Sequence, residues 1–370
     1  MTATIQRCSQ FTRAIATPTD PFITEHGERL DHAKLAFETW GTLSSRRDNA
    51  ILLIHALTGD SHAASHQADD VPGWFEGMIG PGKALDTDRF HVICTNLLGG
   101  CSGSTGPRSI DPRTGQRYNL AFPMLTVRDL VRAQIRLLDR LGISRLHAVV
   151  GGSLGGMQAL EFAAMYPERV GRIVPIGSSA YFSPQGIAYN EVQRRAILMD
   201  PNFRGGEYDD EQGPDQGLAV ARMLGMITYQ SDELMKSRFG RSTDARYHEW
   251  PEFQKRFDIE GYLHYQGDKL VRRFDANSYL YLTRAMDSHD IGWKRGGVEE
   301  GLRLIDAPTL GIGISSDILF PRSYTIEFVD HLRKLGVDAH YQELDSPHGH
   351  DAFLVDFDQL NERMGDFIAR

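Results

Sequence analysis

Short apolar runs alternate with amphipathic segments along much of the chain. The segments Ala50–His55 and Phe90–Thr95 are almost wholly apolar, and Ala33–Gly41 alternates between apolar and polar residues until a glycine ends it. Strands that are apolar on both faces are typical of a parallel sheet covered by helices on either side. Thr126–Leu141 has the spacing of an amphipathic helix and begins with a capping residue. The pattern predicts a doubly wound α/β fold with a mostly parallel sheet.

This alternation is lost from Tyr181 to about Leu304 and then resumes. The later segments with the pattern of strands or helices are Thr309–Ile314, Tyr324–Leu335 and Ala339–Leu344. Inside the interruption, the segments with helical spacing are Asn190–Met199, Leu218–Met226 and Tyr279–Met286. We therefore expect a core domain formed by residues 1–180 and 306–370, with residues 181–305 as one mostly helical insertion.

A serine stands on a predicted sharp turn between a strand and a helix. Gly151, Ser153 and Gly155 form a G-x-S-x-G sequence that follows the apolar run Leu146–Val150 and precedes the helical segment Met157–Tyr166. Such a turn pushes the serine hydroxyl out over the end of the sheet, and glycines let strand and helix approach closely. A glycine-rich turn for phosphate is the alternative, but neither Lys-Ser/Thr nor G-x-G-x-x-G accompanies it here. We expect Ser153 to be a catalytic nucleophile.

A serine hydroxyl is a weak nucleophile, so it needs a base in hydrogen-bond reach and an acid behind that base. After such an elbow the partners follow in the order serine, acid, histidine, each on a loop after a strand. Asp317 follows one predicted strand, and His348 and His350 follow the next. Asp345 and Asp351 are rival acids on the histidines' own loop. This order predicts a catalytic triad, but the spacing does not decide whether His348 or His350 is the base.

The oxyanion of an acyl-transfer reaction needs hydrogen-bond donors aimed at it. One is the backbone N–H of Leu154, the residue after the nucleophile. The second is expected from the loop after the strand that ends at His55, where Leu57 is the candidate.

Composition restricts the classes of partner and compartment. The formal net charge of −9 argues against nucleic acid or an anionic membrane as a partner. No apolar run approaches the length of a membrane span. The three cysteines, Cys8, Cys94 and Cys101, cannot form a disulfide framework and fit a reducing compartment, which favours the cytoplasm. The first 19 residues carry Arg7 and Arg13 and no acids, and we expect a frayed N-terminus there rather than a targeting segment.

Two further sequence features could mark a metal site or a reactive thiol, but an ordinary loop is the preferred interpretation of each. His62 and His66 have a spacing seen in zinc sites, but no third ligand stands at motif spacing, so no metal is expected. The glycine-rich stretch around Cys101 could hold a reactive thiol or a small anion, but a tight loop after a strand is the default interpretation.

The chain resembles the homoserine O-acyltransferases of the α/β-hydrolase superfamily over nearly its whole length. The segments that carry this resemblance are His55–His62, Gly77–Lys83, Asn96–Pro107, Val150–Leu160, Ala221–Tyr229, Phe274–Leu280 and Gly349–Leu354. The resemblance implies that His350 is the base and supports Asp317 as its acid. It also implies that Arg222 binds the carboxylate of the acceptor and Asp351 its ammonium, with Tyr229 nearby.

The same resemblance implies the reaction. An acyl group passes from acyl-CoA, with acetyl-CoA as the expected donor, to Ser153 and then to the side-chain hydroxyl of L-homoserine, on the route to methionine. No cofactor beyond this co-substrate is implied. The helical insertion is expected to act as a lid that forms a deep tunnel and the contact of a homodimer.

Several alternatives stay open at this point. Members of the family use succinyl-CoA or acylate serine, and a triad alone does not distinguish transfer from hydrolysis by an esterase or thioesterase. A non-catalytic binding protein on the same fold is a different class, but the ordered set of Ser153, Asp317 and His350 speaks against it.

Overall fold

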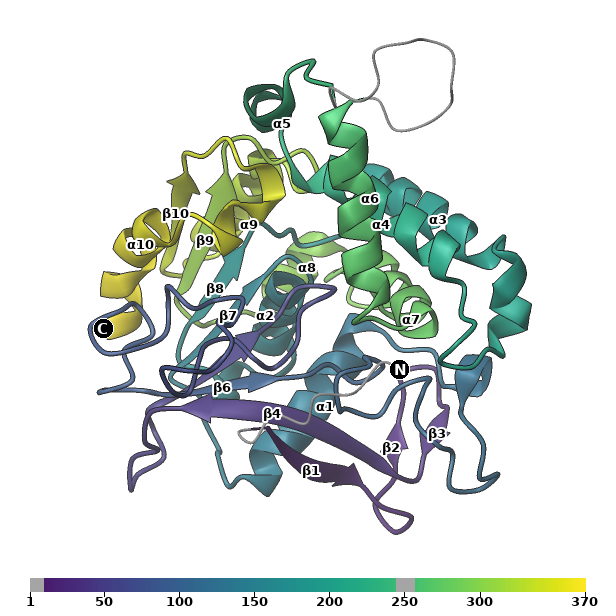
Figure 1. The fold of residues 1–370 in the computed structure, drawn as a ribbon. Coiled ribbons are helices and arrows are strands. Elements are labelled where there is room, and N and C mark those ends of the chain that lie inside the picture. The colour runs from purple at the N-terminus through teal and green to yellow at the C-terminus, as the bar shows by residue number, and fades with distance from the viewer. Residues whose placement is uncertain (1–9, 244–256) are drawn as a thin grey trace.

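The computed structural model describes residues 10–243 and 257–370. An eight-stranded sheet runs through the molecule in the order β1-β4-β6-β5-β7-β8-β9-β10 (Figure 1). The strands β6, β5, β7, β8, β9 and β10 run parallel to one another, whereas β4 is antiparallel to both of its neighbours, β1 and β6. The strands are β1 Phe11–Ala16, β4 Ala33–Trp40, β5 Ala50–Ile54, β6 His91–Thr95, β7 Ala148–Gly152, β8 Ile173–Ile176, β9 Thr309–Ile314 and β10 Ala339–Leu344, with β2 Phe22–Ile23 and β3 Arg29–Leu30 in a small separate sheet.

Helices cover both faces of the sheet. The helices α1 Val127–Arg140, α2 Leu154–Met165 and α9 Arg322–Lys334 pack into one apolar core, and α10 Phe357–Ala369 packs into the other. Alternate residues of β5 enter opposite cores, since Leu52 belongs to the first and Leu53 to the second. This explains why the central strands are continuous apolar runs. The predicted doubly wound, mostly parallel α/β fold is confirmed.

The N-terminal expectation is wrong for part of its length. Phe11–Ala16 is not frayed but forms β1, which pairs with β4 at the edge of the sheet. Only its last two residues are buried, and Phe11 is 54% exposed, so this edge strand has no apolar pattern from which to predict it. Residues 1–9, with Cys8, lie outside the described residues.

Among the residues that the structure describes, six α-helices lie between β8 and β9, above the carboxyl edge of the parallel strands (Figure 1). They are α3 Pro184–Leu198, α4 Asp215–Tyr229, α5 Asp232–Phe239, α6 Asp258–Val271, α7 Ala276–Asp287 and α8 Val298–Leu302. The predicted helical segments became α3, α4 and α7, each longer than expected, whereas α5, α6 and α8 were not foreseen. The division of the chain at residues 180 and 306 into a core and a lid stays a prediction.

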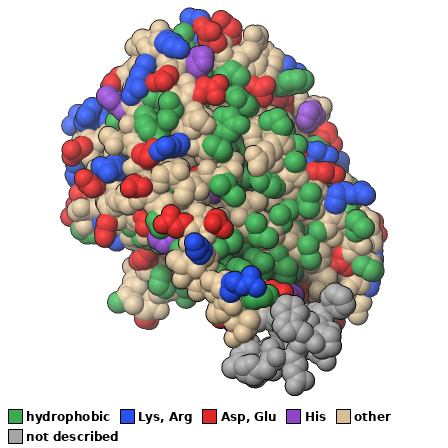
Figure 2. Space-filling model, turned by 90° about the horizontal axis from the view of Figure 1, so that it is seen from above, with side chains coloured by type: hydrophobic (Ala, Val, Ile, Leu, Met, Phe, Trp, Pro, Cys, Tyr) green, Lys and Arg blue, Asp and Glu red, His purple; other side chains and the backbone are tan. Residues whose placement is uncertain are grey.

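Large apolar side chains are exposed on the outer faces of these inserted helices. They are Val192, Leu198, Met199, Val220, Ile227 and Tyr265, each at least 42% exposed. Seen from above, hydrophobic side chains gather across this side of the molecule (Figure 2). Among the residues that the structure describes, none of the helices combines the length and apolar character that crossing a bilayer requires.

Candidate active site

Ser153 stands at the junction of β7 and α2 in a strained backbone conformation. Its φ of 57° and ψ of −120° fall outside the regions that side chains other than glycine usually adopt. Space at this turn is minimal, since a Cβ on Gly151 would lie 2.3 Å from the carbonyl oxygen of Gly155. A Cβ on Gly155 would lie 2.2 Å from the carbonyl oxygen of Ile54 in β5. The G-x-S-x-G sequence therefore forms the sharp elbow that was predicted.

Of the predicted oxyanion donors, Leu154 directly follows Ser153, and Leu57 lines the same cavity as this serine. Leu154 is the first residue of α2, so its N–H has no partner within the helix. The Ala56 carbonyl is held by the Gly59 N–H at 3.0 Å and by the Nδ1 of His55 at 2.6 Å. Because the C=O and N–H of one peptide point in opposite directions, these two bonds turn the Leu57 N–H away from them. That N–H has no acceptor among residues 10–243 and 257–370.

His55 is a supporting residue that the sequence analysis did not identify. Its ring is buried, and burial lowers its pKa against the opposing hydrogen bond to Ala56. A neutral ring with its proton on Nδ1 matches the bond to a carbonyl oxygen. A histidine directly before a predicted oxyanion loop was the available signal.

Asp317 and His350 form a buried acid–base pair. The Nδ1 of His350 donates to the Oδ2 of Asp317 at 2.6 Å. The other carboxylate oxygen accepts the backbone N–H groups of Leu319 and Phe320, both at 2.8 Å. Three donors thus orient an ionised carboxylate, which in turn fixes the tautomer of the histidine.

The environment of His350 raises its pKa. Burial alone lowers the pKa, but the charge and hydrogen bond of Asp317, with the charge of Asp351, outweigh it. The Nε2 of His350 is buried and has no hydrogen-bond partner among the described residues. It lines the same cavity as Ser153, where it is placed to exchange a proton with a hydroxyl.

Of the three rival residues, His348 and Asp345 point elsewhere, whereas Asp351 lines the cavity without a hydrogen bond to His350. The Nδ1 of His348 contacts the Oδ2 of Asp356 at 3.0 Å, outside the cavity. Asp345 is exposed and accepts from Ser315. The geometry therefore favours His350 and Asp317, although their catalytic roles remain predictions.

A cavity of about 480 Å³ joins these residues to the inserted helices. Arg222 and Tyr229 reach it from α4, and Asp351 reaches it from the loop of His350. The Arg222 guanidinium lies over the Tyr229 ring, 5.5 Å from its centroid, and forms no ion pair with Asp351. Burial raises the pKa of Asp351 against the charges of Arg222 and His350. Two opposite charges therefore face one cavity without neutralising each other directly.

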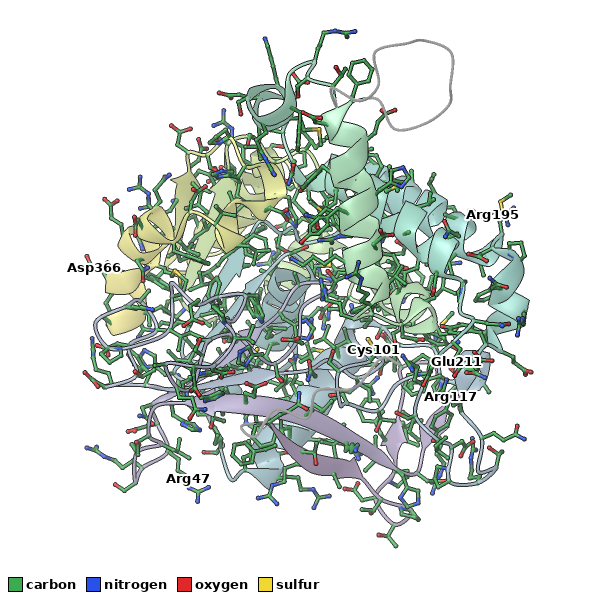
Figure 3. All side chains as sticks on the ribbon, in the orientation of Figure 1. Arg47, Cys101, Arg117, Arg195, Glu211 and Asp366 are labelled. Carbon is green, nitrogen blue, oxygen red and sulfur yellow. The ribbon has the colours of Figure 1, made fainter. Side chains whose placement is uncertain are left out.

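Cys101 does not have the properties of a nucleophile. Figure 3 labels it just below α7, where its sulfur accepts the backbone N–H of Asp275 at 3.4 Å. Burial, together with the charge of Asp275, raises the pKa of the Cys101 thiol to about 12. The thiolate form is therefore scarce at neutral pH.

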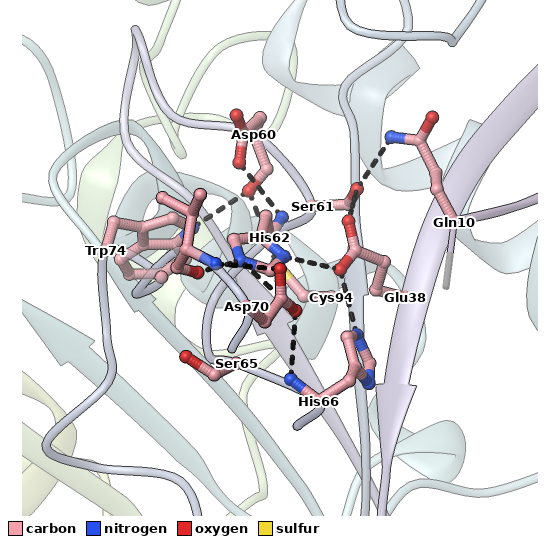
Figure 4. Close-up of polar contacts among 12 residues, drawn as sticks. Gln10, Glu38, Asp60, Ser61, His62, Ser65, His66, Asp70, Trp74 and Cys94 are labelled. Carbon is pink, nitrogen blue, oxygen red and sulfur yellow. Dashed lines mark hydrogen bonds and ion pairs between the residues drawn. The ribbon is translucent and has the colours of Figure 1, made fainter. Parts of the chain in front are cut away.

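His62 and His66 meet a third group, Glu38 of β4, which spacing along the chain could not show (Figure 4). The Oε2 of this buried carboxylate contacts the Nδ1 of His62 at 2.8 Å and the Nε2 of His66 at 3.0 Å. The other nitrogen of His62 faces the Val71 carbonyl at 2.6 Å. Both ring nitrogens of His62 therefore face oxygen atoms of the protein. This network holds residues 60–71 against the sheet, and the absence of a metal stays a prediction.

Comparison with known proteins decides the family. A family model described as the alpha/beta hydrolase fold matches residues 49–357. The homoserine O-acetyltransferase of Symbiobacterium thermophilum is 57% identical over 357 residues, which cover 96% of this chain and 93% of the relative. That of Carboxydothermus hydrogenoformans is 50% identical, with 95% and 93% covered. The chain belongs to the homoserine O-acetyltransferase family of α/β hydrolases.

Solved structures that match this chain include an esterase as well as a homoserine O-acetyltransferase. The homoserine O-acetyltransferase of Bacillus anthracis superposes with a TM-score of 0.90 at 31% identity, covering 98% of this chain and 97% of that one. Esterase E22 superposes with a TM-score of 0.88, also at 31% identity, covering 97% of this chain and 100% of that one. Members of one fold thus carry transferase and esterase names, so the acceptor has to be argued from the cavity.

Replacing Asp317 by Asn is expected to lower kcat/KM about 10⁴-fold, because the amide cannot hold His350 in its working tautomer. A base must be neutral to act, so the acidic limb of the wild-type pH profile is expected above the ordinary histidine value of 6.5. In Asp317→Asn the limb is expected to move down, since burial then acts without the carboxylate charge. Steady-state rates from pH 5 to 9 measure both effects.

Asp345→Asn is the matched control, because this exposed acid stands on the same loop as His350. A wild-type profile in Asp317→Asn, or an equal loss in Asp345→Asn, contradicts the assignment of the acid.

Proposed function

We propose that this protein transfers the acetyl group of acetyl-CoA to the side-chain hydroxyl of L-homoserine through an acyl-Ser153 intermediate, in methionine biosynthesis. The observation that carries the proposal is one cavity lined by Ser153, His350, Arg222 and Asp351. The names of relatives at 50–57% identity support the same activity.

The first half-reaction charges the serine. The Ser153 hydroxyl gives its proton to the Nε2 of His350 while its oxygen attacks the thioester carbonyl carbon. The N–H groups of Leu57 and Leu154 stabilise the oxyanion. The carbon–sulfur bond then breaks, and the thiolate of CoA takes the proton from Nε2.

The second half-reaction repeats this chemistry with the amino acid. The hydroxyl of homoserine gives its proton to His350 and attacks the acyl-serine carbonyl, and Ser153 leaves with that proton. Asp317 stabilises the imidazolium that forms in both steps. No step needs a metal or organic cofactor, and we propose that a chelator leaves the activity unchanged.

The acceptor is a zwitterion, and the unpaired charges in the cavity match its two ends. Arg222 can hold the carboxylate with two hydrogen bonds, and Asp351 can pair with the ammonium. Neither charged end of homoserine reacts, so their binding serves to orient the hydroxyl. Tyr229 supports this site by packing beneath the Arg222 guanidinium and beside the His350 ring, at a centroid distance of 6.0 Å.

Two finer assignments complete the proposal. We place the enzyme in the cytoplasm, because its two described cysteines are free thiols and its substrates are metabolites. We also propose a homodimer through the lid helices. Val220 and Ile227 lie seven residues apart on α4 and are 50% and 45% exposed, so they share one face of that helix. Val192 of the neighbouring α3 is also exposed, at 58%.

Acetyl-CoA without acceptor is expected to acylate wild-type protein on Ser153 and to release one equivalent of CoA. Adding homoserine is expected to produce O-acetylhomoserine and continuous CoA release. Intact-mass measurement and a thiol assay read the two stages. Ser153→Ala is expected to give no adduct, whereas Cys101→Ser keeps it.

Three outcomes would change the function. An adduct on Ser153→Ala removes the nucleophile assignment. CoA release at the same rate without homoserine identifies a thioesterase. A preference for serine as acceptor, or for succinyl-CoA as donor, would show that the protein has one of the other activities found in the family.

Arg222→Ala is expected to acylate Ser153 at a near-normal rate, but to transfer the acetyl group to homoserine at least about 30-fold more slowly, because one buried charge of the acceptor loses its partner. Single-turnover mass spectrometry measures the stages separately, with acetyl-CoA first and homoserine second. Arg195→Ala, on the outer side of α3 (Figure 3), is the matched control and is expected to behave as wild type. Slow acylation with normal transfer would place Arg222 in the donor site instead.

Sedimentation of the wild type is expected to give a dimer. The double variant Val220→Asp and Ile227→Asp is expected to give a monomer, because four carboxylates would enter the apolar interface of a twofold dimer. Ile23→Asp, at an exposed apolar position of β2, is the control and should stay dimeric. A wild-type monomer, or a dimer that survives the double substitution, rules out this interface.

A further inference from the structure

Two basic side chains, Lys269 and Arg273, stand at the mouth of the catalytic cavity. Both line the cavity and both are exposed to solvent. Lys269 lies in the last turn of α6, and Arg273 lies two residues beyond the end of that helix. Arg272, between them, lines a separate cavity with Tyr208 and Asp275. The end of α6 therefore directs two of its three cations toward the active site.

Neither cation forms an ion pair with a carboxylate among the described residues. Among the residues that the structure describes, Lys269 forms no hydrogen bond or ion pair. Arg273 donates from Nη1 to the carbonyl oxygen of Thr58 at 2.5 Å and forms no ion pair. Asp60, which lines the same cavity, accepts the backbone N–H of His62 at 2.9 Å, and its charge raises the pKa of Arg273 against burial. The mouth of the cavity therefore presents positive charge that is free to meet an anion.

This positive charge continues into the cavity. Burial and the charge of Arg222 both lower the pKa of Arg273, so the two guanidinium groups repel one another electrostatically. The protein as a whole carries a net charge of −9 and repels anions. A strongly anionic ligand that enters here needs local cations to attract it, and a charged cleft of opposite sign is how proteins do so.

The donor of the proposed reaction has a matching distribution of charge. Acyl-CoA is neutral at its thioester, which must reach Ser153 at the floor of the cavity. Its negative charges lie on the phosphate groups at the far end of a long, flexible, neutral arm. When the thioester is at Ser153, those phosphates are at the mouth. Ammonium and guanidinium groups bind phosphate oxygens through charge-assisted hydrogen bonds.

We propose that Lys269 and Arg273 bind the phosphate groups of the acyl-CoA donor and so form the nucleotide end of the donor site. This inference rests on the proposed function and names residues that act on the donor only. Arg273 also links this site to the oxyanion loop, because the carbonyl it holds belongs to the residue after Leu57.

The test compares two donors in the same variants. S-acetyl-pantetheine carries the same thioester and arm as acetyl-CoA but no phosphate. Lys269→Ala and Arg273→Gln are each expected to raise the KM for acetyl-CoA about tenfold, since each loses a hydrogen bond to a charged group. With S-acetyl-pantetheine the KM of Lys269→Ala is expected to stay within about twofold of the wild type. Arg273→Gln also loses the hydrogen bond to the Thr58 carbonyl, so its donor effect is the extra rise in KM with acetyl-CoA over that with S-acetyl-pantetheine. Lys269→Arg is expected to restore the KM for acetyl-CoA.

Arg272→Ala is the matched control, because it removes the neighbouring cation that lines the other cavity. This substitution is expected to leave the KM for both donors unchanged. An equal rise in KM for both donors in Lys269→Ala, or no rise for either donor, overturns the inference. The wild-type rate with S-acetyl-pantetheine and homoserine reports the proposed function independently, because that reaction uses neither cation. Failure of the donor site is therefore distinguishable from failure of the activity.

Discussion

Three stretches of backbone meet at the end of β7 with no space for a side-chain atom between them. Gly151 faces the carbonyl of Gly155, and Gly155 faces the carbonyl of Ile54 in the neighbouring strand. This contact forces Ser153 into a positive φ and lifts its hydroxyl clear of the sheet. Any larger residue at either glycine would push α2 away from β5 and β7. The nucleophile is therefore a consequence of how closely one helix approaches two strands.

The remaining polar groups are arranged around this point by the parallel sheet. The strands β5, β7, β9 and β10 end at the same edge, so the loops that follow them carry Leu57, Ser153, Asp317 and His350 to one place. Burial makes each charge in this region depend on a specific partner. The Asp317 carboxylate accepts three hydrogen bonds, and the Glu38 carboxylate contacts His62. Both buried carboxylates therefore have specific partners.

Much of this could be predicted from local sequence. The bounds of β9 and β10 were predicted to the residue, because Thr309–Ile314 and Ala339–Leu344 are short runs between clear turn signals. The order of Ser153, Asp317 and His350 followed from the sheet, and only the family resemblance separated His350 from His348. The edge strand β1 was missed because four of its six residues are exposed. Glu38 was missed because its partners, His62 and His66, are 24 and 28 residues away, and no local pattern encodes such contacts.

The insertion between β8 and β9 has a consequence for how such a protein can change over generations. In the arrangement proposed here, the core supplies the nucleophile, the base and Asp351, whereas the inserted helices supply Arg222, Lys269 and Arg273. Substitutions in those helices can thus alter which molecules are admitted without disturbing the strained turn that makes the serine reactive. One ancestral catalytic apparatus can in this way be inherited intact by descendants with different substrates, and the likeness of this chain to both transferases and an esterase is the pattern that such inheritance leaves.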